Sequence, residues 1–274
     1  MSAPLIITTK ALFYLGSLVG IGAGTHFAAG IATARQWLWF GAALAPLSVA
    51  IGLFGMNLQI VGDTARFDDF SMFGWIWPGL RDQTFAILAG AALLAAAAIA
   101  RRRSLALLGA IAISVGFGLA GHAQSEGMPV WLWLLVSVHV IIAGFWLVAP
   151  LTLWPRRNLA TQVISSRLRL FSQIAVVAVP ILFVAGLWLA FIIGGSWVDL
   201  LSSSYGQLLT TKLAVVSTAL GFGAFNKLRL TERIERNSDE GRLRLKQSLT
   251  AEFALFTGAL LAIAAATTVY GPHG

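Results

Sequence analysis

The chain contains no cysteine among its 274 residues. This absence excludes disulfides, thiolate metal sites and covalent attachment of c-type haem. Charge is also scarce, because Asp, Glu, Lys and Arg make up only 11% of the residues, against about 25% in soluble domains. Hydrophobic residues make up 58%. We therefore expect one membrane-embedded domain, residues 1–274, with no room for a separate soluble domain.

Two kinds of catalytic motif are missing as well. The sequence has neither a glycine-rich loop ending in Lys-Ser or Lys-Thr, which would cradle nucleotide phosphates, nor the motif of a phosphorylated ATPase. No hydrolytic site is visible. The sequence therefore predicts a protein that is not an enzyme and is not an ATP-driven pump.

What the chain does have is a series of long apolar runs. A helix needs about 20 apolar residues to cross the hydrocarbon core of a bilayer. Candidate spans are 8–31, 38–60, 82–100, 104–122, 130–153, 169–193, 205–226 and 248–270. The predicted fold is all-α, a polytopic transmembrane bundle of about eight spans. The segment 61–81 between the second and third spans is expected to be the longest outer loop, with aromatic residues at the membrane interface.

The basic residues predict the orientation of this bundle. Of the 19 Lys and Arg residues, fifteen lie in alternate loops, and the positive-inside rule places these loops in the cytoplasm. They are Arg35, Arg101, Arg102, Arg103, Arg156, Arg157, Arg167, Arg169, Lys227, Arg229, Arg233, Arg236, Arg242, Arg244 and Lys246. Both termini then lie outside. The net charge of +8 is thus explained by topology, and we expect the lipid bilayer rather than nucleic acid as the partner.

Histidine and methionine supply the candidate metal ligands. Counted from Pro129, His139 is about ten residues into its span, near the bilayer midplane, and intramembrane ionisable residues are functional by default. His122 and Met128 lie at the outer ends of neighbouring spans, and imidazole with thioether suits copper. Met56 lies near the outer end of its span, where it could also fill the core. His26 lies toward the cytoplasmic end of the first span, where a structural role is equally open.

Two further charged residues fall inside apolar spans. Lys212 lies about two turns into span 205–226, which costs about 2.5–3.5 kcal/mol on insertion scales. Its amine could snorkel to the interface. Glu252 lies near the inner end of span 248–270. Antiparallel neighbours of these lengths would hold the two roughly 10–20 Å apart, so a direct ion pair between them is not expected.

The last hundred residues carry an ordered set of motifs. They are Tyr205-Gly206-x-x-Leu209-x-x-Lys212, then Asn226-Lys227-x-Arg229-Leu230, then Ser248-Leu249-x-x-Glu252. With these motifs, residues 167–268 resemble the copper resistance D family of bacterial inner-membrane proteins. The resemblance makes Tyr205, Lys212, Asn226 and Glu252 family markers. It implies copper uptake from the periplasm into the cytoplasm, beside a separate periplasmic copper-binding protein.

Three hypotheses follow. In the leading one, copper is received by His122 with Met128 or Met56, passes to His139 and leaves toward His26, through few sites that bind weakly enough to release it. In the second, the chain is a membrane redox protein that binds haem b through histidine, although the three histidines lie at different depths. In the third, it is a structural or assembly subunit whose polar groups only hold helices together.

Overall fold

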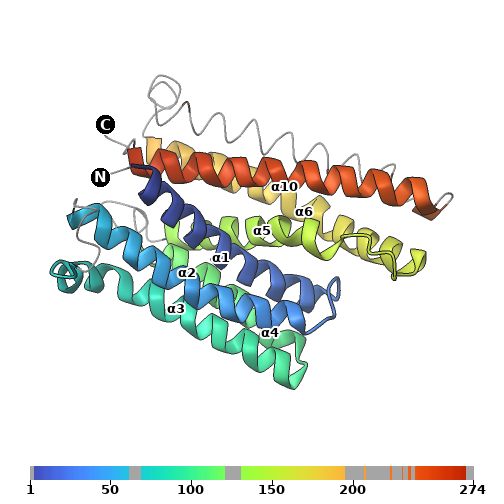
Figure 1. Cartoon of the computed structure of the whole chain (residues 1–274), viewed down its shortest axis with the longest axis horizontal. Helices are drawn as coiled ribbons and strands as arrows, with labels where there is room; N and C mark the ends of the chain where they lie inside the picture. Colours follow the sequence, from blue (N-terminus) through green and yellow to red (C-terminus); the bar gives the residue numbers. More distant parts are fainter. Residues whose placement is uncertain are drawn as a thin grey trace.

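The computed structural model describes residues 3–61, 69–120, 131–194 and 238–269, together with the single residues 207, 223, 230, 234 and 235. The long elements of this part of the chain are all helices (Figure 1). They are α1 (Ala3–Ala29), α2 (Gln36–Val61), α3 (Phe73–Ala100), α4 (Arg103–Gly118), α5 (Leu132–Thr152), α6 (Thr161–Gly194) and α10 (Ser238–Val269).

Six of these described helices are long and apolar enough to cross a membrane, and α4 is a shorter apolar helix. The prediction of a polytopic helical bundle is therefore confirmed. Of the predicted span 205–226 only residues 207 and 223 are described, so the expected number of eight spans stays a prediction. The architecture is that of a multi-pass membrane protein.

Helix α1 lies at the centre of the bundle. It packs against α2, α4, α5 and α10, and its second half is almost entirely buried. Glycines allow this crowding: a Cβ added at Gly24 would lie 2.6 Å from the Ala106 carbonyl oxygen of α4. Small residues let membrane helices approach closely enough for van der Waals packing to hold them together. Helix α1, which the sequence predicts only as the first of several spans, is thus the helix around which the others are arranged.

One end of the bundle collects the basic loops and is called the basic end below. The residues that define it are Arg35, Arg101, Arg102, Arg103, Arg156 and Arg157. Here Arg242, near the start of α10, donates hydrogen bonds to the carbonyl oxygens of Arg156 at 3.0 Å and Leu159 at 2.7 Å. These bonds fasten α10 to the connection between α5 and α6.

The opposite end holds the start of α1 and the end of α10 (Figure 1). Lys10 Nζ donates a hydrogen bond to the Thr267 carbonyl oxygen at 2.9 Å. The last carbonyls of a helix have no partner within it, and a cation there is favourable. The first and last described helices therefore meet at the same end of the bundle.

Helices α6 and α10 are longer than a membrane requires. With 34 and 32 residues, they are about 51 and 48 Å long, against a hydrocarbon thickness of about 30 Å. Figure 1 shows both extending past α1 and α4. The excess lies at the basic end, where Arg167, Arg169, Arg242 and Arg244 are located.

The prediction of a long loop over 61–81 was wrong in its second half. Helix α3 begins at Phe73, so Trp75 and Trp77 lie on its first turns. The rings of Phe73 and Trp77, four residues apart, stack at a centroid distance of 5.8 Å. Contacts at this spacing stabilise a helix, and here helical structure continues through Pro78 in spite of the lost backbone donor.

Candidate functional site

His139 lies on α5, packed against α6. A Cβ added at Gly186 of α6 would be 3.0 Å from Cε1 of the imidazole and 3.4 Å from Nδ1. A larger residue at this position would make the ring shift by a few tenths of an ångström. The imidazole therefore lies at the contact between α5 and α6.

The position of His139 along α5 follows from where the helix begins. Helix α5 starts at Leu132, seven residues before His139, which corresponds to about 10 Å along the axis. His139 is thus the eighth of the 21 residues of the helix, three residues before its middle.

His26 is fully buried between α1 and α5, with a relative exposure of 0%. Its Nε2 lies 2.8 Å from the Phe145 carbonyl oxygen, and its Nδ1 lies 2.8 Å from Thr152 Oγ1. A carbonyl oxygen only accepts hydrogen bonds, so Nε2 carries the proton and donates it. Nδ1 of the neutral ring then accepts from the Thr152 hydroxyl.

These two hydrogen bonds use both ring nitrogens of His26. The ring also lies 4.6 Å from the Phe145 ring, centroid to centroid. No lone pair is left to offer to a metal in this arrangement, so His26 acts here as a linker between α1 and α5. Sequence reasoning missed Thr152, because a threonine near the end of an apolar helix gives no signal of a partner 126 positions away.

The two described intramembrane histidines lie at different levels. His26 bonds to the carbonyl of Phe145, which is six residues after His139 on α5, or about 9 Å along the axis. Metal–nitrogen bonds are about 2.0–2.1 Å long for a typical divalent metal. The two imidazoles therefore do not share one metal or the two faces of one haem in this structure.

Of the three remaining candidate ligands, the structure describes only Met56. Met56 is half-buried on α2, and the neighbouring Asn57 donates from Nδ2 to the Asp69 carbonyl oxygen at 2.7 Å, which ties α2 to the approach to α3. His122 and Met128 lie outside the described residues. Within the described ranges, no three His, Asp or Glu side chains gather as they would around a metal ion.

Of the four expected family markers, Glu252 alone is described. It lies on α10 with a relative exposure of 2% and accepts a hydrogen bond from Ser248 Oγ at 3.4 Å. Tyr205, Lys212 and Asn226 lie outside the described residues, so the expected distance between Lys212 and Glu252 stays a prediction. The spacing of Ser248 and Glu252 puts the two on one face of α10, as in the motif.

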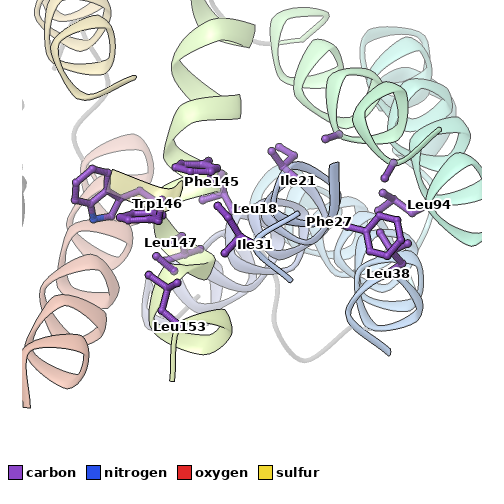
Figure 2. Packing of buried hydrophobic residues seen from close by; sticks show 14 of the residues in the cluster. Leu18, Ile21, Phe27, Ile31, Leu38, Leu94, Phe145, Trp146, Leu147 and Leu153 are labelled. Atoms are coloured by element: carbon purple, nitrogen blue, oxygen red, sulfur yellow. The ribbon is translucent and has the colours of Figure 1, made fainter. Parts of the chain in front are cut away.

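An aromatic cluster joins the first five helices to α6 and α10. The rings of Phe145 and Phe171 stack at 5.1 Å with an angle of 8°, and Trp146 meets Phe171 at 5.4 Å and Phe256 at 6.4 Å. Figure 2 shows Phe145 and the indole of Trp146 at successive positions of α5, with Trp146 directed toward α10. This cluster could not be predicted from the sequence, because aromatic residues are common throughout the apolar spans.

Comparison with known proteins gives one match. Residues 165–266 match the model of a family described as CopD, copper resistance protein D. No curated protein and no solved structure matches the chain. The matched segment begins in α6 and ends in α10, so it includes Gly186, Phe171 and Glu252. Residues 165–266 are therefore similar to the copper resistance protein D family, as the motifs in this part of the chain predicted.

Proposed function

We propose that this protein carries copper across a membrane and that the His139 imidazole binds the ion on its way. The observation that carries the proposal is the contact of His139 with Gly186, because it places a copper-compatible donor directly against the segment that defines the family. Imidazole suits copper, and a histidine inside a membrane bundle is a functional group by default.

The distribution of charge supports an orientation. The basic end would face the cytoplasm by the positive-inside rule, and both termini would lie outside, since Lys10 and the Thr267 carbonyl meet at the opposite end. A bacterial inner membrane is the location that the family implies. Copper would then enter from the periplasm, delivered by a separate copper-binding protein, and move down a gradient or with coupled ions.

The entry ligands would be His122 with Met128 or Met56, followed by His139. The sequence suggested His26 as the last ligand, but its hydrogen bonds to Phe145 and Thr152 argue for leaving it out of the path. Few and separate sites suit conduction, because an ion must bind well enough to enter and weakly enough to leave.

Copper uptake into proteoliposomes tests the proposal. His139→Ala and His122→Ala should each lower the flux at least about tenfold, because even the loss of a group that only orients a ligand costs about 10–100-fold in metal affinity. Ser137→Ala is the matched control on α5, since among the described residues the Ser137 hydroxyl bonds to the Trp133 carbonyl of its own helix. Unchanged flux in both histidine variants would refute the relay.

The same preparations separate this proposal from the two other hypotheses. A visible spectrum with a strong Soret band that disappears in His139→Ala would indicate haem binding instead. A His139→Ala variant that unfolds more easily, yet transports copper normally per folded molecule, would indicate a purely structural histidine.

A further inference from the structure

A polar cavity of about 660 Å³ opens at the basic end of α6. Its described wall consists of positions 161, 162, 165, 166, 169, 170 and 173 of α6, together with Glu235. These positions recur every three to four residues and so form one face of the helix. Apart from Leu170, they carry hydroxyl, amide or charged groups. Such a polar face is unexpected on a helix that is otherwise a membrane span.

The cavity lies at the level of lipid headgroups. The apolar part of α6, residues 174–194, has 21 residues and is about 31 Å long. That length equals the thickness of the hydrocarbon core. The next residues toward the basic end, including Gln173 and Arg169, must therefore lie in the headgroup layer. The cavity faces the part of a lipid that carries its charges.

Arg169 and Glu235 place opposite charges side by side in this wall. Arg169 Nη2 donates a hydrogen bond to Glu235 Oε1, and both side chains are well exposed, at 64% and 42%. An exposed pair of this kind contributes little to stability. The guanidinium has five N–H donors and the carboxylate has several acceptor positions, so one mutual bond leaves most of them available. The described residues that line the cavity carry no net charge, although Arg242 reaches its edge at Thr161, and this balance suits a zwitterion better than a simple cation.

Ser165 provides a second and independent observation. It is 5% exposed, it lines the cavity, and its Oγ has no hydrogen-bond partner in the structure. Buried hydroxyls nearly always have a partner, because an unmade hydrogen bond costs free energy. The Oγ atom itself is buried, and a change of the Ser165 rotamer would turn the hydroxyl toward the cavity, where a phosphate oxygen would accept its hydrogen bond.

We propose that this cavity binds the headgroup of a phospholipid that carries both a phosphate and a primary ammonium. The phosphate would accept hydrogen bonds from Arg169 and Ser165, and the ammonium would donate to Glu235. The membrane that α6 crosses supplies this ligand at the required depth. The inference is independent of copper transport, because it uses none of the proposed copper ligands.

Lipid titration of the purified full-length chain tests the site. Phospholipids with identical acyl chains and ethanolamine, choline or glycerol headgroups are added in detergent, and apparent affinity is read from the thermal shift of tryptophan fluorescence. The ethanolamine lipid should bind most tightly, since choline has no N–H to donate and glycerol has no charge. Glu235→Gln should remove this preference, and Arg169→Gln should weaken all three lipids about tenfold. Ser165→Ala should weaken them about threefold.

Matched controls come from the exposed pair on α10, in which Arg244 Nε donates to Glu240 Oε1 at 3.0 Å. Arg244→Gln and Glu240→Gln remove the same charges from the same end and should leave the preference intact. Equal binding of the three headgroups to the wild type would overturn the proposal. The proposal would also be overturned if substitutions in the Arg244–Glu240 pair changed the headgroup preference as much as those in the Arg169–Glu235 pair. A thermal shift reproduced by inorganic phosphate alone would identify a site for free phosphate instead of a lipid.

Discussion

The linkage of His26 to Thr152 makes a prediction that separates a structural histidine from a copper ligand. Thr152→Val keeps the volume of the side chain but removes the hydroxyl that lies 2.8 Å from Nδ1. Hydrogen bonds between membrane helices contribute about 0.6 kcal/mol on average and at most about 1.7 kcal/mol. The whole penalty for a buried acceptor left without a donor is about 1–3 kcal/mol, which overlaps that range. Because the site is fully buried, we expect Thr152→Val to destabilise the protein by about 1–2 kcal/mol.

His26→Ala should cost more. It also removes the hydrogen bond to the Phe145 carbonyl and the ring contact at 4.6 Å, and it leaves a cavity between α1 and α5. Large-to-small substitutions in a core cost about 2–5 kcal/mol. The two changes should not be additive, because Thr152→Val removes a bond that His26→Ala has already broken. The coupling should be about 1 kcal/mol.

The assay is the free energy of unfolding in mixed micelles for the wild type, both single variants and the double variant, with copper flux measured per folded molecule. We expect Thr152→Val to lower the free energy of unfolding and to leave the copper flux unchanged. Stabilities within about 0.5 kcal/mol of the wild type would contradict the linker role. Loss of copper flux without loss of stability would instead show that His26 binds the ion.

Two glycine substitutions test the close contacts of the bundle, with Gly258→Ala as their common control, because a Cβ at Gly258 meets nothing within 4 Å. Gly22→Ala would drive a methyl group into Val148 and the Gly144 carbonyl, so it should lower the free energy of unfolding by about 1–3 kcal/mol. An unfolding curve like that of the control would contradict this packing. Gly186→Ala would displace the neighbouring imidazole, 3.0 Å from the new Cβ, by a few tenths of an ångström. Copper uptake by Gly186→Ala should fall severalfold, while its stability should stay near that of the control. Normal uptake would indicate that copper does not bind to His139 during transport.

The sequence predicted the helices well because hydrophobic length is a local property. Six of the predicted spans correspond to long described helices, and the run 104–122 corresponds to α4, Arg103–Gly118. The boundaries failed where polar or aromatic residues continue a helix beyond the hydrocarbon core. Thus α6 starts at Thr161 rather than 169, and α3 starts at Phe73 rather than 82.

The candidate site was less predictable, because ligand chemistry depends on what each side chain faces. His26 and His139 have the same kind of sequence context, because each is a histidine within an apolar span. The fold gives His26 two hydrogen bonds with α5, one donated and one accepted, and places His139 against a glycine of α6. These contacts join residues far apart in the chain, and periodicity within one helix carries no information about them.

The sequence by itself determined the class of the protein, its helices, the alternation of its basic loops and its family resemblance, since each follows from composition and order along the chain. The tertiary structure alone decided which helix is central, which histidine is committed to packing, and how one polar face of α6 meets Glu235. The physical reason is that burial and hydrogen-bond partners are set by neighbouring helices. A lone pair is available to a metal only if no neighbour has already taken it.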